Sequence, residues 1–481
     1  MKTAYIIRYV GMALLCNAAF MFICAIVGMC YGFDTGTAPL LLSFIITSII
    51  GIFPRIFVPS NKSITSRDGY LIVLTSWLAS CLMGMLPYLI WGGEFNIVDA
   101  WFESTSGFTT TGATILNNIE ALPHSLLMWR SLTHWIGGVG VVLFTLVVLP
   151  SIGRQKMTLS SAELSTIAKD NFRYNTKKIL HIIFIVYVGL TAAEAIALRI
   201  AGMNWFDAVA HSFSTLATGG FSTKNLSIMA YDSLAIETVI TIFMLLAGVH
   251  FGLIYNTIRG KGQSLWNNEV SRFYFLTMLI GGGLIALNLY TNDVYDSVGD
   301  SIRYGLFQTV SYGTTTGFAS ANSAFWPPFS MLFLIVVSIQ CAMAGSTTGG
   351  IKSDRMLLLF KSIKHRILKI QHPNAVMTTR LGGRPQDIKT IQFALVLVVF
   401  YLLALFFSTV FLTFFDIDLL TAFTASVASI GNVGPGFGEI SNLNNMDFFN
   451  PTVKIWLTIM MLFGRLELFG LIHLFTIRSW R

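Results

Sequence analysis

Four short loops of glycine, threonine and other uncharged residues have the composition expected of an ion-binding backbone. None contains an acid or a base, so they offer coordination by carbonyl and hydroxyl oxygens. We align Gly112, Gly219, Gly317 and Gly434, which are 107, 98 and 117 residues apart, and this spacing indicates a fourfold internal repeat. The loops read Thr110-Thr111-Gly112-Ala113, Ala217-Thr218-Gly219-Gly220, Thr315-Thr316-Gly317-Phe318 and Asn432-Val433-Gly434-Pro435.

Each loop follows a short amphipathic segment that begins near an aspartate. The segments start at Asp99, Asp207, Asp300 and Asp418, and an aspartate at this place can cap the N-terminus of a helix. Each segment is too short to cross a bilayer, and each lies between two long apolar runs. The pattern predicts four half-helices that enter the membrane from outside and end near its middle.

The position of the loops in the membrane restricts what they can do. Non-helical backbone is tolerated at that depth only where protein buries it or where it lines a water-filled cavity. Four such loops around one axis would present rings of carbonyl oxygens, which can replace the hydration shell of a potassium ion. Glycine permits the close backbone approach that such rings need, and the C-terminal ends of the half-helices favour cations.

We therefore predict a potassium selectivity filter, with the potassium ion as the only bound cofactor. The alternative, a set of small-residue packing motifs, fits less well because such motifs lie inside helices and these loops lie between them. The predicted filter residues are Thr110, Thr111, Gly112, Thr218, Gly219, Thr315, Thr316, Gly317, Asn432, Val433 and Gly434.

The composition places these loops in a polytopic membrane protein. The chain is 54% hydrophobic and 11% charged, against about a quarter charged in ordinary globular domains. Charge-free runs such as 9–33, 71–93 and 390–415 reach the roughly 20 residues needed to cross hydrocarbon. We predict an all-α fold with about ten transmembrane helices and four helix–pore-helix–helix repeats arranged pseudo-fourfold around one pore. The units are 1–68 for two extra N-terminal helices, then 69–160, 161–262, 263–372 and 373–481 for the repeats.

The positive charge of the chain is distributed as topology requires. If alternate loops lie on one side, 25 of the 31 lysines and arginines fall on that side. The positive-inside rule then places both termini in the cytoplasm, and nucleic-acid binding is a poor explanation of the basic loops. Arg465 is predicted to lie inside a helix. The basic residues left on the outer side are Arg130, Arg199, Lys224, Arg303 and Lys454.

The order of these motifs resembles the Trk/Ktr/HKT superfamily of potassium transporters, and within it the TrkH-type subunits. The resemblance covers essentially the whole chain. It implies a potassium-selective ion-conducting subunit for uptake across the bacterial cytoplasmic (inner) membrane. Members of the superfamily that favour sodium tend to carry serine in place of the first-repeat glycine, whereas this chain has Gly112 there. The resemblance therefore implies a preference for potassium, with rubidium also accepted. The motifs are SGFTTTGAT, HSFSTLATGGFST, TTTGF, GNVGPGFG, AGSTTGGIKSDR, QHPNAV and MLFGRLELF.

The resemblance also implies partners. Family members form homodimers in the membrane and dock on a cytosolic TrkA-type regulatory subunit of the RCK class, which binds nucleotide and gates the pore. The basic segments 154–178 and 352–389 are the expected docking surface on this chain.

A gate is predicted in the third repeat. Its second apolar run extends from about Phe329 to beyond Phe360 and is interrupted by a stretch of glycines and hydroxyl residues. Such a stretch suits a loop that lies under the filter and obstructs the pore, and a simple glycine kink is the alternative. We expect Arg465 to project below the filter and contact this loop, because an unpaired charge inside a membrane helix needs a partner. The gate residues are Gly345, Ser346, Thr347, Thr348, Gly349, Gly350 and Arg465.

Other kinds of function have weaker support in the sequence. GSTTGGIKS at 345–353 fails as a nucleotide-binding P-loop because Ile351 interrupts the motif. No residue set suggests covalent chemistry, so we do not expect an enzyme. A potassium–proton symporter remains the alternative, with Glu103, Glu194, His211 and His250 as intramembrane proton-carrying candidates. Glu103 and His211 lie on the half-helices, where support of the filter is the simpler role. A non-conducting assembly subunit is disfavoured by four complete loops.

Overall fold

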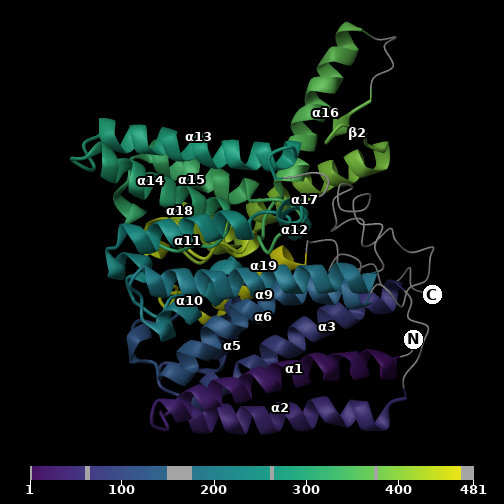
Figure 1. Cartoon of the computed structure of the whole chain (residues 1–481), viewed down its shortest axis with the longest axis vertical. Coiled ribbons are helices and arrows are strands. Elements are labelled where there is room, and N and C mark those ends of the chain that lie inside the picture. The colour runs from purple at the N-terminus through teal and green to yellow at the C-terminus, as the bar shows by residue number, and fades with distance from the viewer. Residues whose placement is uncertain (1–2, 60–65, 149–175, 261–264, 373–377, 467–481) are drawn as a thin grey trace.

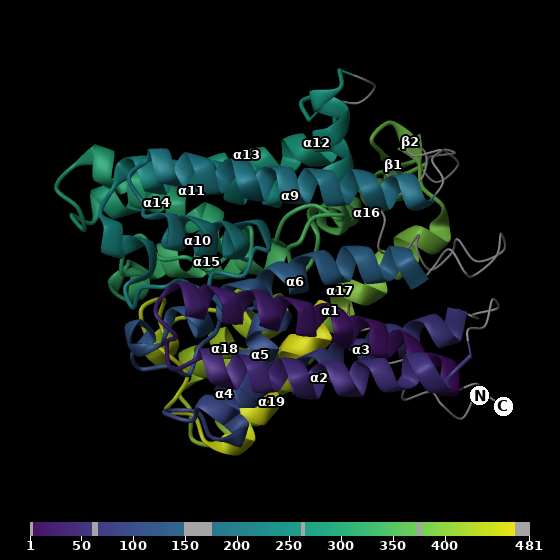
Figure 2. The ribbon, with the colours of Figure 1, turned by 60° about the horizontal axis from the view of Figure 1, so that its bottom comes forward.

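A computed structural model describes residues 3–59, 66–148, 176–260, 265–372 and 378–466, and these are largely helical. Most long helices run roughly side by side across the molecule (Figure 1). Two helices, α1 (Thr3–Cys30) and α2 (Thr37–Phe57), precede the repeats. They pack on each other, and α1 also packs on α3 and α6 of the first repeat (Figure 2).

Each repeat consists of a first helix, a half-helix and a second helix. Repeat 1 contains α3 (Ser66–Gly84), α4 (Leu86–Trp91), the half-helix α5 (Ile97–Phe108) and α6 (His124–Val148). Repeat 2 contains α9 (Thr176–Ile200), α10 (Trp205–Leu216), α11 (Leu234–Ala247) and α12 (Phe251–Ile258). Repeat 3 contains α13 (Glu269–Thr291), α14 (Val298–Gly313), α15 (Pro328–Gln340) and α16 (Ser353–Gln371). A small hairpin of β1 (Arg380–Leu381) and β2 (Arg384–Pro385) leads to repeat 4, with α17 (Ile388–Thr413), α18 (Leu419–Gly431) and α19 (Pro451–Arg465).

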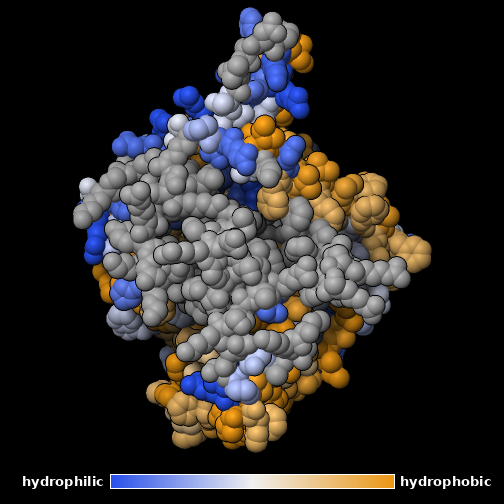
Figure 3. Space-filling view, turned by 90° about the vertical axis from the view of Figure 1, so that its right-hand side faces the viewer, coloured by the Kyte–Doolittle hydropathy of each residue, from blue (hydrophilic) through white to orange (hydrophobic). Residues whose placement is uncertain are grey.

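The helices account for the predicted all-α membrane fold. Among the described residues, six helices are long and apolar enough to span a bilayer, and α11 with α12 makes a seventh if the bent pair is one span. The remaining predicted spans are the second helices of repeats 1, 3 and 4, of which α15 and α19 have only 13 and 15 described residues. Figure 3 looks onto the end that carries α16: hydrophilic residues gather toward its top, and hydrophobic residues cover much of the flanks.

The caps of the half-helices differ from the prediction in three repeats. Asn96, Asn204 and Ser297 are the N-caps of α5, α10 and α14, and their side-chain oxygens accept backbone N–H groups of the first turn. The aspartates at 99, 207 and 300 lie in that first turn, where a negative charge favours the N-terminal end of the helix dipole. Only Asp418 caps its half-helix as predicted.

The second helices of repeats 2 and 3 are both broken. The run 238–258 contains no lysine, arginine, aspartate or glutamate, but it bends by 105° between α11 and α12. The run from Phe329 to beyond Phe360 stops at Gln340 and resumes as α16 at Ser353. The two breaks touch: Met343 N donates to Gly248 O (3.0 Å), and Phe251 N donates to Gly345 O (3.4 Å).

The predicted unit boundaries are only partly comparable with the helices. Helix α3 begins at Ser66, so the first repeat starts three residues before our boundary at 68/69. The boundary at 372/373 follows the end of α16 at Gln371. Those at 160/161 and 262/263 lie outside the described residues.

Four of the five basic residues assigned to the outer side join elements by ion pairs. Arg303 on α14 binds Glu237 on α11 through two contacts of 2.8 Å. Lys454 on α19 binds Asp99 on α5 at 2.7 Å, and Lys224 lies 3.7 Å from Glu120. Arg130 is not in a loop as we assumed, since it lies within α6, buried against Glu103 at 2.5 Å. The pair of Arg303 connects repeat 3 with 2, that of Lys454 connects repeat 4 with 1, and that of Lys224 connects repeat 2 with 1. The pair of Arg130 joins two helices of repeat 1.

We predict that Lys454→Ala destabilises the folded protein by about 3–5 kcal/mol, because the buried Asp99 carboxylate would lose its counter-charge. Thermal unfolding of the detergent-solubilised protein measures the effect. The matched control is Lys224→Ala, whose exposed pair should contribute no more than about 1 kcal/mol. Equal losses for the two variants would contradict this assignment.

Candidate ion pathway

The four loops adopt one backbone conformation. Each has a residue with a left-handed φ of 52–56° one or two positions after the end of its half-helix: Thr110, Thr218, Thr315 and Asn432. Two positions later each has a glycine with φ of 78–93°: Gly112, Gly220, Gly317 and Gly434. Only glycine adopts such angles freely, so the second position explains the glycine in every repeat.

This geometry corrects the alignment of repeat 2 by one residue. We paired Gly219 with Gly112, but the structural equivalent of Gly112 is Gly220, which our filter omitted. Gly219 instead takes the place of Thr111, Thr316 and Val433. Hydrogen bonds confirm the register, since the backbone N–H of each of these four residues donates to a carbonyl five residues earlier at 2.9 Å.

The loops close into a ring through glycine-to-carbonyl contacts. A Cβ placed on any of the four glycines would lie no more than 2.5 Å from a carbonyl oxygen of the next loop. Gly112 faces Gly219 O, Gly220 faces Thr316 O, Gly317 faces Val433 O, and Gly434 faces Thr111 O. The order is therefore repeat 1, 2, 3, 4 and back to 1, so the ring is closed.

The repeated quartet TTTG belongs to opposite members of this ring. In repeat 1, the hydroxyls of Thr109 and Thr111 share a hydrogen bond of 2.8 Å, and Thr314 and Thr316 do the same in repeat 3. Repeats 2 and 4 have no such pair, because Ala217 and Gly431 occupy the first of these places. The ring is thus fourfold in backbone and closer to twofold in side chains.

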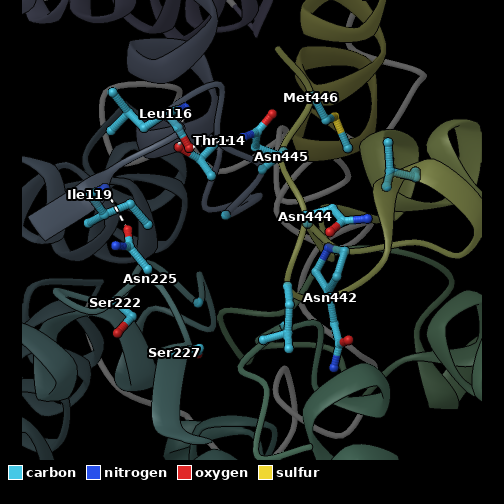
Figure 4. A pocket seen from close by; sticks show the side chains of 18 of the residues that line it. Thr114, Leu116, Ile119, Ser222, Asn225, Ser227, Asn442, Asn444, Asn445 and Met446 are labelled. Atoms are coloured by element: carbon cyan, nitrogen blue, oxygen red, sulfur yellow. Dashed lines mark hydrogen bonds between the residues drawn. The ribbon is translucent and has the colours of Figure 1, made fainter. Parts of the chain in front are cut away.

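A polar cavity of about 120 Å³ lies on the outer side of the ring and is lined by all four glycines (Figure 4). Its walls are loops that follow the filter, and each wall bonds to the next. Ile119 N donates to Asn225 Oδ1 (2.7 Å), and Met229 N donates to Ala319 O (3.0 Å). Asn442 Nδ2 donates to Ala321 O (2.7 Å), and Met446 N donates to Thr114 O (2.8 Å). A second closed ring therefore surrounds the mouth.

The predicted gate loop lies against the inner side of the filter. Thr347 Oγ1 donates to Leu216 O at the end of α10 (2.9 Å), and Gly349 N donates to Thr315 Oγ1 (3.1 Å). A Cβ on Gly349 would overlap Gly431 O, so the loop also meets repeat 4. Ser346 and Thr348 bond to each other at 2.8 Å, and Lys352 bonds to Thr348. Gly345 and Gly350 both have positive φ, and Gly345 leaves no room for a Cβ beside the His250 ring.

Arg465 contacts the gate loop as predicted. Its Nη1 donates to Thr347 O at 2.6 Å, and its Nη2 donates to Gly137 O of α6 at 3.3 Å. The side chain is buried, with 6% of its surface exposed. Through Arg465 the loop is therefore joined to repeat 1 as well.

The four intramembrane groups named for proton coupling have different surroundings. Glu103 accepts from Thr114 Oγ1 and Ile115 N of the first loop and pairs with Arg130. Both ring nitrogens of His211 are engaged, with Asp207 O and Ser222 Oγ. His250 Nδ1 accepts from Gly252 N. Glu194 is fully buried, and neither carboxylate oxygen has a hydrogen-bond partner among the described residues.

Arg130 is a site residue that the sequence analysis missed. It lines the outer cavity, and its Nη1 donates to Ser222 O of the second loop at 2.9 Å. The signal that could have identified it is its place in an otherwise apolar helix beginning at His124, since buried charges in membrane helices have partners.

The chain also matches proteins of known family. It matches the family described as "TrkH: Cation transport protein" over residues 37–479. It is 36% identical over 482 residues to the Trk system potassium uptake protein TrkH of Escherichia coli (strain K12), with 99% of each chain covered. The Vibrio parahaemolyticus protein of the same name is 34% identical over 489 residues, covering 100% of both.

A solved structure supports the same assignment. The crystal structure of the potassium transporter TrkH from Vibrio parahaemolyticus is similar with a TM-score of 0.91, at 32% identity and with 100% of both chains covered. By sequence and by fold over its full length, this chain belongs to the TrkH family of cation transport proteins, a family of membrane transporters.

Proposed function

We propose that this chain is the potassium-selective, ion-conducting subunit of an uptake system in the bacterial cytoplasmic membrane, with both termini in the cytoplasm. The observation that carries the proposal is the closed ring of four loops. Carbonyl oxygens held in a ring can take the place of the water molecules that hydrate a potassium ion. The half-helices add the partly negative ends of their dipoles at the same depth. The transport named for the relatives agrees with this chemistry.

The ions that pass the ring would next meet the gate loop. The loop touches repeats 2, 3 and 4 directly and repeat 1 through Arg465, so in this conformation it obstructs the inner end of the proposed pathway. Many of its bonds join uncharged groups, which suits a segment that moves aside at low energetic cost, while Lys352 and Arg465 are the charged groups bonded to it. The positive charge of Arg465 adds an electrostatic barrier to cations.

Control is proposed to come from a cytosolic, nucleotide-binding partner of the TrkA and RCK type, acting on a homodimer. Helix α16 begins at Ser353, three positions after Gly350 of the gate loop, so force on this helix would reach the gate through a short segment. The second expected docking segment, 154–178, lies almost entirely outside the described residues.

Gly220→Ala is expected to abolish potassium uptake, because a Cβ at this position would overlap Thr316 O. The backbone φ of +81° is also one that alanine rarely adopts. Rubidium tracer influx into proteoliposomes measures the effect. Gly283→Ala in α13 is the matched control, since a Cβ at Gly283 meets no atom within 4 Å. Normal influx through Gly220→Ala would refute the ring as the filter.

Arg465→Ala is expected to increase potassium flux several-fold, because the gate loop would lose its bond at Thr347 O and the pathway would lose a positive charge. Single-channel or macroscopic currents in planar bilayers record the change. Arg259→Ala, which removes an exposed arginine at the end of α12, should leave the current unchanged. Unchanged current and gating in Arg465→Ala would remove this residue from the gate.

A potassium–proton symporter is the second candidate, and Glu194 is the observation that favours it. Thr215 Oγ1 lies near this carboxyl group and donates to His211 O at 2.8 Å. Burying an ionised carboxylate without a partner is costly, so a protonated Glu194 suits this place. Exchange of that proton would break no ion pair, in contrast to a proton carried by Glu103, which is paired with Arg130.

The reversal potential under separate potassium, sodium and pH gradients decides between the two candidates. A pore gives a potential that follows the potassium gradient and ignores pH, and Glu194→Gln then behaves like the wild type. A symporter gives a potential displaced by pH, and Glu194→Gln abolishes the displacement. The elements packed against α9 are α6, α10, α11 and α12. Their other titratable groups are Asp207 and His211 on α10, Glu237 on α11, Tyr255 on α12 with His250 as its N-cap, and His124, Arg130 and His134 on α6.

A further inference from the structure

Two residues of α6 hold the filter loop of the neighbouring repeat from behind. Arg130 and His134 are one helical turn apart, and both are buried. The Arg130 guanidinium carbon lies 3.6 Å from the centroid of the Phe221 ring. The His134 ring stacks on the same ring, with centroids 4.0 Å apart and planes inclined by 15°. Two groups this close to one centroid occupy opposite faces, so Phe221 is clamped between them.

The clamp acts next to the filter backbone. Phe221 directly follows Gly220, whose backbone touches Thr316 O in the ring. Arg130 also donates to the backbone O of Ser222, the residue after Phe221 in the sequence. The Nε of Arg130 pairs with Glu103, and the Glu103 carboxylate accepts hydrogen bonds from Thr114 and Ile115 of the first loop. One helix of repeat 1 therefore fixes the loops of both repeats 1 and 2.

His134 further explains the one irregular residue of the ring. At the place where the other repeats have Thr111, Thr316 and Val433, repeat 2 has Gly219. A Cβ on Gly219 would overlap the His134 ring, so the imidazole occupies the space of the missing side chain.

Packing rather than hydrogen bonding accounts for the position of this imidazole. Its Nδ1 has one long contact of 3.3 Å to Ser214 Oγ, and its Nε2 has no hydrogen-bond partner among the described residues.

We propose that Arg130 and His134 are positioning residues that set the repeat-2 carbonyls of the ring and thereby the preference for potassium over sodium. The proposal rests on the proposed function, since it requires the ring to be the filter. Aromatic and cation–π contacts suit this role, because they fix a ring in place without offering a competing ligand to the ion.

The experiment measures two quantities for each variant of the reconstituted full chain. The first is the potassium-to-sodium permeability ratio, obtained from bi-ionic reversal potentials, and the second is the maximal rubidium influx. His134→Ala is expected to lower the ratio about two- to tenfold, the range that one lost aromatic stacking contact implies. Gly219→Thr alone should lose influx, because its side chain would collide with the imidazole. His181→Ala, on an exposed face of α9, is the matched control and should change neither quantity.

The double variant His134→Ala with Gly219→Thr separates positioning from general packing. Its loop reads Thr-Thr-Gly, as in repeats 1 and 3, and the threonine fills the space that the imidazole leaves. If the permeability ratio of the double variant returns to within about twofold of the wild-type ratio, the proposal is supported. A change of about twofold is the smallest effect expected from losing one stacking contact. A double variant that is no better than His134→Ala overturns it, as does an unchanged ratio in His134→Ala.

Two further measurements keep the test decisive. If His134→Ala does not fold, Phe221→Leu and Arg130→Lys, which weaken the same clamp, must lower the ratio in its place, and an unchanged ratio in both overturns the proposal. A wild-type protein that fails to distinguish potassium from sodium refutes the proposed filter itself, whereas a selective wild type with an unaffected His134→Ala refutes only the positioning role.

Discussion

The structure depends on one steric constraint, the contact of each filter glycine with a carbonyl oxygen of the next loop. Four such contacts close a ring, and each leaves no space for a single methyl group. Backbones can come this close only if the helices behind them also do, and α6 and α19 meet this need with glycines. Gly137 lies against Phe108 O and Gly464 against Ile430 O, at equivalent points of repeats 1 and 4. The ring thus determines where small residues are required far beyond the loops.

Much of this arrangement could be predicted from the sequence, because apolar runs and recurring glycines are long-range patterns that survive divergence. The half-helices and the loops followed from them, and the contact of Arg465 with the gate loop followed from the need of a charge inside a membrane helix for a partner. The register of repeat 2 did not, since Gly219 and Gly220 are adjacent and composition cannot say which has positive φ. The bend between α11 and α12 was not predicted either, because the run 238–258 is apolar and free of lysine, arginine, aspartate and glutamate, as a continuous span would be.

The outer and inner sides of the ring are held by different kinds of interaction. Outside, ion pairs and hydrogen bonds connect neighbouring repeats, and the ion pairs include those of Arg303 with Glu237 and of Lys454 with Asp99. Inside, the gate loop is held mainly by neutral hydroxyl and amide groups, and it meets the break between α11 and α12. This difference suits the proposed function, in which the filter keeps its shape while the gate loop moves.

The covalent continuity of the four repeats has an evolutionary consequence. In an assembly of four identical chains, any substitution in the filter appears four times, and a histidine placed behind each loop would have to fit everywhere at once. Here a change alters one quarter of the ring. Gly219 of repeat 2, packed against His134 of repeat 1, is such a local solution. In the proposed filter, four repeats on one chain therefore allow selectivity to be adjusted one quadrant at a time, through residues that lie behind the loops.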